Sequence, residues 1–285
     1  MKVTEKAFAK INLFLDVTAK RSDGFHELCS VMQSVSLADE ITLSATRADY
    51  TCITLSCDDE SLPLDERNLA YVAAERFLEK TGITARVDIY IEKHIPVSAG
   101  LAGGSTDAAA VLRALNLIFD ESLTTEALLC LGAEIGSDVP FCILGGTCLC
   151  RGRGETMEPY SVPDAYFVIC KPNGEGMQTP KAYALLDDAF DHFKEDASAL
   201  HDALLSFFRE DPYYGMYNVF ESVVLPQCAC AAEIRSELIA LGARGALMSG
   251  SGTAVFGVFD TEDEAVEASR EMPGGVVCRS VGPIL

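Results

Sequence analysis

The sequence predicts an α+β protein built in two parts, residues 1–160 and 161–285. Apolar residues recur with strand alternation in some segments and with helical spacing in others, without a long series of parallel strands. Pro159 and Pro163 flank a polar stretch, which indicates the boundary. Of the 285 residues, 49% are hydrophobic and 23% are charged, so the chain can bury a full core and is not disordered.

Composition also limits the partners. The net charge of −21 argues against binding to nucleic-acid backbones, which need clustered Lys and Arg. A phosphorylated small molecule stays compatible, because a glycine loop and Mg²⁺ supply local positive potential. No apolar run approaches the ~18 residues of a membrane span, and the N-terminus lacks a signal-peptide pattern. We expect a cytoplasmic protein, a monomer or homodimer, that binds neither nucleic acid nor membrane.

The cysteines are numerous, but their number, eleven, is odd and no C-x-x-C pair occurs. The two C-x-C pairs, Cys148/Cys150 and Cys228/Cys230, lie among apolar residues without a histidine at ligand spacing. Buried free thiols are therefore favoured over a zinc site, and no metal-ligating residue is predicted.

The first predicted element is a strand from Ala7 to Leu15, in which successive side chains point to opposite faces. Lys10 and Asn12 share one of these faces with two phenylalanines. A lysine on a strand is ordinarily solvated, but the aromatic neighbours make a fully solvated face less favourable. These residues alone leave a solvated lysine and a site lysine equally open.

A turn is predicted at Asp23–Gly24, with Phe25 and His26 directly after it. An aromatic ring and an imidazole side by side can hold a planar base, by stacking and by edge hydrogen bonds. The alternative, a core phenylalanine beside a surface histidine, is favoured on this evidence alone and stays open.

The next segments predict three strands and two helices. Strands are expected at 41–43, 52–56 and 87–92, and helices at 68–80 and 108–119. Gly82 lies where the glycine that follows a helix C-cap is expected. These elements lead up to and away from the most distinctive segment of the chain.

That segment, P-V-S-A-G-L-A-G-G-S-T, joins the third strand to the second helix. Gly100, Gly103 and Gly104 lack Cβ, so the backbone can adopt positive φ and approach a ligand. The helix start offers unpaired N–H groups and a positive dipole end, which suit a phosphate. The spacing is neither that of a P-loop nor G-x-G-x-x-G. A tight turn with Ser105 or Thr106 as N-cap is the equally open alternative.

Asp138 follows a short predicted helix that Thr124 or Thr125 caps, and it lies in the segment I-G-S-D-V-P-F. An unpaired carboxylate among such apolar residues is costly to desolvate. The pattern favours a turn aspartate, and the alternative is a charge kept for chemistry and paired with a cation.

The second part predicts alternating helices and strands up to the last residues. Strands are expected at 165–170, 245–248, 253–259 and 276–279, and helices at 197–208, 218–225, 231–241 and 262–271. A second glycine turn, Ser249–Gly252, joins two of these strands. A plain hairpin turn and a ligand-facing turn are equally compatible with it.

Three of these segments together resemble the GHMP kinases, the superfamily of galactokinase, homoserine kinase, mevalonate kinase and phosphomevalonate kinase. They are the strand with A-K-I-N-L, the loop P-x-x-x-G-L-x-G-G-S-[ST] and the turn M-S-G-S-G, in matching order across nearly the whole chain. The resemblance implies a ribosomal-S5-domain-2-like N-terminal domain at 1–160 and a ferredoxin-like α/β sandwich at 161–285. It places the active site in the cleft between them.

Within that superfamily, A-K-I-N-L, R-S-D-G-F-H-E-L (21–28) and I-G-S-D-V-P-F (135–141) resemble one branch. Its enzymes use ATP to phosphorylate the 2-hydroxyl of a cytidine-diphosphate-linked polyol in the non-mevalonate isoprenoid pathway. The resemblance implies ATP and Mg²⁺ as cofactors. The implied ATP-binding residues are Pro96, Val97, Ser98, Ala99, Gly100, Leu101, Ala102, Gly103, Gly104, Ser105 and Thr106.

The same resemblance implies the remaining roles. Asp138 accepts or orients the proton of the attacking hydroxyl, and Lys10 pairs with it and neutralises charge on the transferring phosphoryl group. Ser105 or Thr106 touches a phosphate or Mg²⁺. The implied substrate-binding residues are Asn12, Phe25, His26 and Thr179.

Three positions depart from the common pattern of the family. Phe25 replaces a tyrosine, which keeps the stacking surface and loses the phenol hydroxyl. Ala102 replaces a glycine of the loop, and Thr106 replaces a serine while keeping a hydroxyl.

Other functions compete with this one. The nearest is a GHMP kinase that acts on mevalonate, a sugar or homoserine, against which the D-G-F-H-E-L segment argues. A non-catalytic nucleotide-binding homologue is a second, and the presence of Lys10 and Asp138 argues against it. A dinucleotide dehydrogenase is disfavoured, because the glycine spacing differs and no parallel-sheet pattern occurs.

Overall fold

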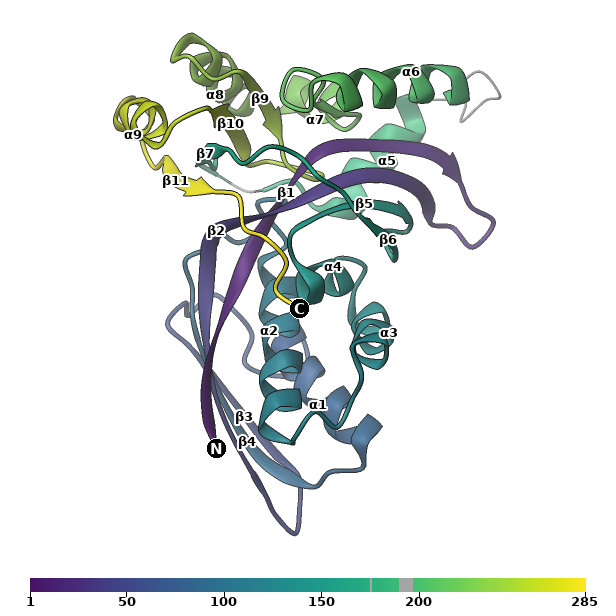
Figure 1. Cartoon of the computed structure of the whole chain (residues 1–285), viewed down its shortest axis with the longest axis vertical. Helices are drawn as coiled ribbons and strands as arrows, with labels where there is room; N and C mark the ends of the chain where they lie inside the picture. The colour runs from purple at the N-terminus through teal and green to yellow at the C-terminus, as the bar shows by residue number, and fades with distance from the viewer. Residues whose placement is uncertain (175, 190–196) are drawn as a thin grey trace.

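Two β-sheets organise the molecule (Figure 1). The structure is a computed structural model, and it describes residues 1–174, 176–189 and 197–285. Within those residues the first sheet has seven strands: β1 (Lys2–Lys20), β2 (His26–Arg47), β3 (Cys52–Cys57), β4 (Ala85–Glu92), β5 (Thr147–Gly152), β6 (Thr156–Pro159) and β8 (Tyr217–Asn218). The second, within the same residues, has four: β7 (Tyr166–Cys170), β9 (Gly245–Met248), β10 (Val255–Phe259) and β11 (Val276–Arg279).

The helices pack on these two sheets. Their bounds are α1 (Leu69–Thr81), α2 (Gly103–Ile118), α3 (Thr125–Ile135), α4 (Val139–Leu144), α5 (Thr179–Ala189), α6 (Ala197–Glu210), α7 (Glu221–Val224), α8 (Ala229–Ala240) and α9 (Glu262–Glu271), with a 3-10 turn at Leu225–Gln227. In Figure 1, α1, α2 and α4 lie on one face of the first sheet, α3 packs against these helices, and α8 and α9 lie against the second sheet. The long strands β1 and β2 run past both layers.

Helix ends that the sequence marks lie where predicted. The side chain of Asn68 accepts a backbone N–H at the start of α1, and Gly82 follows its end in the left-handed conformation, with φ of 66°. Thr124 caps α3 by accepting the N–H of Ala127. Local chemistry is sufficient for such ends, because the capping partner lies within a few residues along the chain.

The prediction is wrong for 218–225, where α7 is four residues long and begins at Glu221. Residues 217–218 form β8 instead, which pairs in parallel with Phe14 and Leu15 of β1. This pairing joins segments about two hundred residues apart, so the local spacing of apolar residues does not reveal it.

The middle of β1, from Ala9 to Val17, is buried on both faces. Helices α2 and α4 contact it, and Phe14 packs against Phe208 of α6 with ring centroids 5.6 Å apart. Lys10 is 5% exposed and Asn12 is 1% exposed, so the solvated alternative for their face is wrong. An ammonium and an amide at such positions need partners, because an unpaired buried polar group is costly.

The hydrophobic core crosses from one part of the chain to the other. Phe14 of β1 belongs to the same buried cluster as Phe167 of β7 and Phe256 of β10. Near the C-terminus, the N–H of Val281 donates to the carbonyl oxygen of Ser34 on β2. The predicted boundary falls between β6 and β7, and the two parts it separates share one core.

The eleven cysteines all lie within the described residues and are free thiols. Cys148 and Cys150 are buried, and burial raises the pKa of both thiols. Cys230 is exposed on α8 and Cys228 is half-buried, so the expectation of buried thiols is wrong for this pair. Among the described residues, no group of three or more His, Cys, Asp or Glu could hold a metal ion. No described helix combines the length and apolarity that a bilayer crossing requires.

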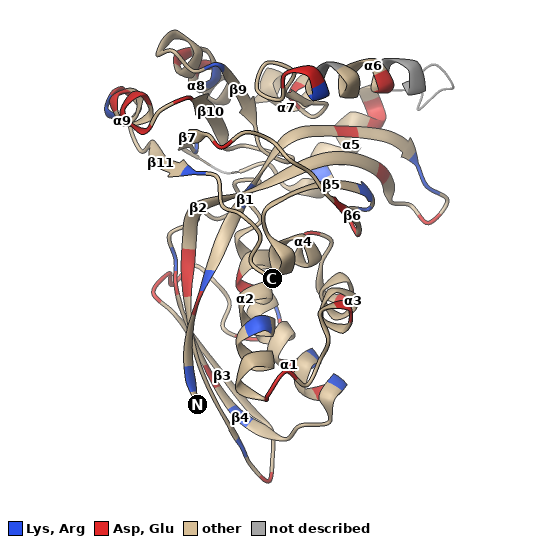
Figure 2. Cartoon of the chain, in the orientation of Figure 1, with Lys and Arg blue, Asp and Glu red and all other residues tan. Residues whose placement is uncertain are grey.

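Acidic residues occur on helices and strands of both parts of the chain (Figure 2). Helix α9 shows how they are accommodated: Glu262, Asp263 and Glu264 occupy its first turn, and Arg270 lies in its last turn. This order matches the helix dipole. Because the negative charge is spread out, binding of an anion depends on donors that are placed locally.

A buried pair holds α6 against β1. His201 is 8% exposed, and its Nδ1 lies 2.7 Å from Oδ2 of Asp16. Hydrogen bonds to Asp16 and Cys29 raise the pKa of His201 from 6.5 to about 9. The imidazole is therefore charged at neutral pH in the folded protein.

We expect this pair to stabilise the fold fully below pH 6.5 and to lose its effect as the pH rises through about 9, because the folded pKa exceeds the unfolded value. The melting temperature of His201→Gln should lie below that of the parent at about pH 6, and the difference should shrink toward about pH 10. Asp16→Asn removes the same pair from β1 and should behave alike. A difference that stays constant over this range would contradict the assignment.

Candidate active site

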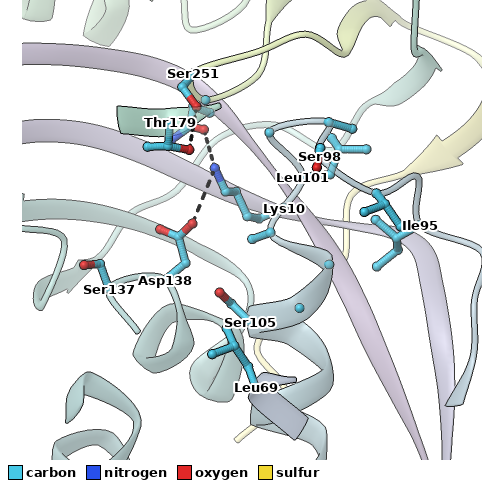
Figure 3. Close-up of a pocket in the computed structure, with 18 of the residues that line it drawn as sticks. Lys10, Leu69, Ile95, Ser98, Leu101, Ser105, Ser137, Asp138, Thr179 and Ser251 are labelled. Carbon is cyan, nitrogen blue, oxygen red and sulfur yellow. Dashed lines mark hydrogen bonds and ion pairs between the residues drawn. The ribbon is translucent and has the colours of Figure 1, made fainter. Parts of the chain in front are cut away.

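A cavity of about 770 Å³ lies between the two parts of the chain. Its walls come from β1, the glycine-rich loop, the start of α4, α5 and the turn between β9 and β10 (Figure 3). The sequence-predicted residues that line it are Lys10, Asn12, Phe25, His26, Pro96, Val97, Ser98, Ala99, Gly100, Leu101, Ala102, Gly103, Gly104, Ser105, Asp138 and Thr179. Segments from the first residues to position 251 therefore converge on one space.

The helix after the glycine loop begins earlier than the capping alternative requires. Helix α2 starts at Gly103, and Ala102 precedes it with φ of +60° and no side-chain cap. Ser105 and Thr106 lie inside the first turn, so the alternative in which one of them is the N-cap is wrong. Thr106 is 1% exposed and donates its hydroxyl to the carbonyl of Gly103 at 2.8 Å. Ser105 points into the site in Figure 3 and is the hydroxyl available to a phosphate.

The three loop glycines differ in backbone conformation and in the space around them. Gly100 has positive φ, +77°, and a Cβ there would lie 2.2 Å from the carbonyl oxygen of Ser249. Gly103 and Gly104 are helical, so the expected use of positive φ holds for Gly100 and not for them. A Cβ on Gly103 would lie 3.3 Å from Nζ of Lys93, whereas the nearest atom to one on Gly104 would be 3.8 Å away. The start of α2 thus has room for a ligand close to its N–H groups.

Three segments that are distant in the sequence are joined at this loop. The N–H of Lys10 on β1 donates to the carbonyl of Leu101 at 3.2 Å. The hydroxyl of Ser249, in the second glycine turn, donates to the carbonyl of Gly100 at 2.9 Å. The second turn joins antiparallel neighbours as a hairpin does, and its residue Ser251 also lines the cavity, so the two alternatives are compatible with each other.

Lys10 and Asp138 face each other in the cavity, with Nζ and Oδ2 4.0 Å apart (Figure 3). Nζ of Lys10 also donates to Oδ1 of Asn12 at 2.7 Å, and Nδ2 of Asn12 donates to Oγ of Ser30 at 2.8 Å. The side chain of Lys10 is 6% exposed and that of Asp138 is 34% exposed. The ammonium is therefore held by the buried amide of Asn12, and the carboxylate of Asp138 is accessible from the cavity. Asn12 orients Lys10, a contact that the sequence pattern did not indicate.

Asp138 precedes α4, but its side chain makes no capping hydrogen bond there. Asp138 does lie in a turn, at the N-cap position of α4, but its carboxylate is not used for capping and faces the ammonium of Lys10 instead. The residues that follow, Val139, Pro140 and Phe141, are buried and anchor the start of α4. This apolar anchor holds the carboxylate at the cavity wall opposite Lys10.

Phe25 and His26 line the cavity beside α5. The ring of His26 stacks on Tyr183, with centroids 4.7 Å and planes 29° apart, and its Nε2 lies 2.7 Å from Oδ1 of Asp187. Phe25 is 49% exposed, and the guanidinium carbon of Arg153 lies 3.7 Å from its ring centroid. The alternative of a core phenylalanine beside a surface histidine is wrong, because the phenylalanine is the exposed member of the pair.

Helix α5, Thr179–Ala189, is absent from the sequence prediction and supplies part of this wall. Oγ1 of Thr179 lies 3.0 Å from Oγ of Ser251, so the helix start contacts the second glycine turn (Figure 3). Tyr183, one turn later, also lines the cavity, and burial raises the pKa of its phenol. The available signal was Pro180, which is typical of a first helical turn, followed by the apolar residues Ala182 and Leu186 at i, i+4 spacing.

A buried charge cluster beneath the loop was also not predicted. Nζ of Lys93 contacts Oδ2 of Asp39 and lies 2.9 Å from Oδ2 of Asp107. Oδ1 of Asp39 accepts the N–H groups of His94 and Ile95, at 2.6 and 2.8 Å. Burial raises the pKa of Asp107 to about 7, against the opposing charge of Lys93. The cluster fixes the segment that enters the glycine loop, and it leaves Lys93 engaged.

Family profiles match both parts of the chain: GHMP kinases N terminal domain at residues 68–146 and GHMP kinases C terminal at 190–276. A crystal structure of 4-(cytidine 5'-diphospho)-2C-methyl-D-erythritol kinase is 33% identical, covers 98% of this chain and 99% of its own, and has a TM-score of 0.79. A homoserine kinase from Cytophaga hutchinsonii shares the fold, with a TM-score of 0.76, 19% identity and coverage of 99% and 95%. Together with the glycine loop, these matches define the class, and the chain belongs to the GHMP kinases.

Three curated relatives narrow the family further. They come from Exiguobacterium sibiricum (44% identity, covering 93% of this chain and 92% of the relative), a Synechococcus species (44%, covering 92% and 86%) and Caldicellulosiruptor bescii (41%, covering 94% and 93%). Each of the three is a 4-diphosphocytidyl-2-C-methyl-D-erythritol kinase. The chain belongs to the family of these kinases.

Gly100→Ala should force the two glycine turns apart, because its Cβ would lie 2.2 Å from the carbonyl oxygen of Ser249 and its φ is +77°. We expect the free energy of unfolding to fall by roughly 2–4 kcal/mol and KM for ATP to rise about tenfold or more. Gly104→Ala is the matched stability control, since Gly104 is helical and unobstructed. Urea unfolding of both variants measures the difference, and equal stabilities would rule out the packing argument.

Proposed function

We propose that the chain transfers the γ-phosphoryl group of ATP to the 2-hydroxyl of 4-diphosphocytidyl-2-C-methyl-D-erythritol, in the non-mevalonate route to isoprenoid precursors. The observation that carries this proposal is the Lys10–Asp138 pair inside a cavity that the glycine loop and the Phe25–His26 segment also line. The relatives at 41–44% identity support the choice of acceptor, because each is a kinase of that compound.

ATP is assigned to the glycine-loop side of the cavity. The start of α2 directs unpaired N–H groups there, and the hydroxyl of Ser105 lies beside them. Leu62, Pro63 and Ile95 line the same side and offer apolar contacts to a nucleotide base. Thr106 contributes through its bond to Gly103, which shapes the loop, and not by contact with ATP.

The transfer step assigns separate roles to the two charged residues. Asp138 accepts the proton of the attacking hydroxyl, whose oxygen forms a bond to the γ-phosphorus. The bond from that phosphorus to the bridging oxygen breaks, and ADP leaves with the electron pair. Lys10, held by Asn12, neutralises charge on the transferring group. Phosphoryl transfer depends mainly on the alignment of the reacting groups, so the buried contacts of β1 that hold Lys10 contribute to catalysis.

Mg²⁺ fits the oxygen donors of this site. It retains several waters and binds through one or two protein groups together with substrate phosphates. The hydroxyl of Ser105 and the accessible carboxylate of Asp138 are donors of that kind, so a larger acidic cluster is not needed. Bound Mg²⁺ would neutralise charge on the phosphate oxygens of ATP. Ser105, on the phosphate side, is the residue that would hold it there.

The direct test is incubation of the purified chain with ATP, Mg²⁺ and the cytidylated polyol, with mass spectrometry of the product. Parallel reactions with mevalonate, homoserine and galactose serve as controls for other acceptors. Phosphorylation of one of these, without phosphorylation of the cytidylated polyol, would overturn the proposal. Turnover of the expected acceptor would exclude a non-catalytic homologue.

Asp138→Asn should lower kcat by roughly 10²–10⁴-fold with folding intact, because the amide cannot accept the proton of the hydroxyl. Lys10→Met should give a comparable loss, and the double variant should lose less than the product of the two, since the groups act together. Steady-state kinetics and circular dichroism provide the measurements. A kcat of Asp138→Asn close to that of the parent would remove Asp138 from the mechanism.

Phe25→Ala should weaken binding of the cytidylated substrate by roughly tenfold or more, because it removes the stacking surface for cytosine. KM for ATP should stay unchanged, since Phe25 lies away from the glycine loop. Phe25→Tyr, which restores the residue common in the family, is the control and should bind as tightly as the parent. The assignment must be dropped if Phe25→Ala binds the substrate with the affinity of the parent.

A further inference from the structure

Among the described residues, Arg153 is the one lysine or arginine of the cavity wall whose side chain makes no hydrogen bond or ion pair; its backbone N–H donates to a carboxylate oxygen of Glu155. It lies in the turn between β5 and β6. The other basic side chains of the wall are engaged: Lys10 and Lys93 contact carboxylates, and Arg67 is paired with Asp65. Nε of Arg153 is buried and has no partner in the described structure. A charge in this condition indicates a missing ligand.

Arg153 lies between the two ends of the proposed acceptor site, the base end at Phe25 and the polyol end at Asp138. Its guanidinium carbon is 3.7 Å from the ring centroid of Phe25, where the base is assigned. The next residue, Gly154, faces the other end, since a Cβ there would lie 3.6 Å from the carbonyl oxygen of Ser137. Ser137 adjoins Asp138, where the acceptor hydroxyl is assigned. The turn therefore spans the region that joins the base to the polyol.

The turn is tied to the segment that carries Phe25. The N–H of Gly152 donates to Oε1 of Glu27 on β2 at 3.1 Å, and Nη1 of Arg21 donates to Oε2 of the same carboxylate at 2.9 Å. Arg153 thus keeps its position relative to Phe25 through the backbone as well as through the ring contact.

A stacked guanidinium remains able to bind an anion. Its N–H donors lie in its own plane and point outward from the ring, and their fork matches two phosphate oxygens. Phe25 is 49% exposed and lines the cavity although Arg153 lies over its ring, so part of the ring surface remains available to a base. One ring can therefore contact both the cytosine and the arginine.

We propose that Arg153 binds the diphosphate group of the acceptor substrate, with Phe25 holding the guanidinium in place. The inference rests on the proposed function and assigns a residue to the part of the substrate between base and polyol. It also answers a charge problem, because a chain with a net charge of −21 needs a local cation to bind an anionic acceptor. Arg153 acts in binding and specificity, and the chemical step stays with Lys10 and Asp138.

The test compares a ligand that has the diphosphate with one that lacks it, in the parent and in variants of Arg153. Calorimetry measures the binding of cytidine and of CDP, with a saturating non-hydrolysable ATP analogue to occupy the nucleotide side. For the parent, we expect CDP to bind roughly 10- to 100-fold more tightly than cytidine, as charge-assisted hydrogen bonds allow. Arg153→Met should lose most of this gain, while its affinity for cytidine should stay within about threefold of the parent.

Arg153→Lys should recover part of the gain, because it keeps the charge and loses the planar fork. Arg151→Met is the matched control: Arg151 is exposed two residues earlier and does not line the cavity, so the full gain should remain. In the parent itself, added salt should reduce the gain for CDP without changing the affinity for cytidine, which tests the charge without any substitution.

Two outcomes would overturn the inference. One is an equal loss of affinity for cytidine and CDP in Arg153→Met, which would mean that Arg153 only supports Phe25. The other is a CDP gain that survives both the substitution and added salt. Because these measurements need no turnover, they are separate from the kinase assay. A parent that binds CDP through Arg153 and does not phosphorylate the polyol would contradict the proposed function alone.

Discussion

The contact between Gly100 and the carbonyl oxygen of Ser249 constrains the rest of the site. Two backbone segments from the two parts of the chain, about 150 residues apart in sequence, meet there so closely that no Cβ fits between them. The same loop accepts a hydrogen bond from the backbone of Lys10, through Leu101. The direction of α2, and with it the direction of its N–H groups, is thus fixed relative to the strand that carries Lys10. In the proposed function, nucleotide binding and catalysis would therefore share one backbone frame.

The burial of β1 on both faces determines how the charged pair can work. An ammonium that is 6% exposed requires compensation, and Lys10 receives it from Asn12 and from Asp138. Coulomb interactions are stronger in such surroundings than in water, so in the proposed reaction Lys10 would act on developing charge with little screening. Asp138 is more exposed, and in the same proposal a bound acceptor would cover it and exclude water. The strand therefore supplies a low-dielectric environment before any substrate binds.

Features with local causes could be predicted from the sequence, and features with distant partners could not. The cap at Asn68 and the glycine after α1 follow from groups within a few residues. The pairing of β8 with β1 and the cluster of Lys93 with Asp39 join residues far apart, and no spacing rule reveals them. The capping alternative for Thr106 is wrong because its hydroxyl donates to a carbonyl of its own helix, that of Gly103, and does not accept a backbone N–H. The residues of the candidate site could be predicted mainly from the family motifs, because these carry information about the fold that local patterns lack.

Differences in capping and charge at the helix N-termini suggest how a protein with a net charge of −21 can bind a triphosphate. Helices α1, α3 and α9 begin with side-chain caps, and α9 adds three carboxylates to its first turn. Helix α2 has neither: Ala102 offers no capping group, and its first turn contains no acidic residue. The positive end of α2 and its unpaired N–H groups are therefore left for a ligand, at a cost that bound phosphates offset. Since Lys93 is already neutralised by two carboxylates, the proposed phosphate site depends on this uncapped helix start together with Lys10.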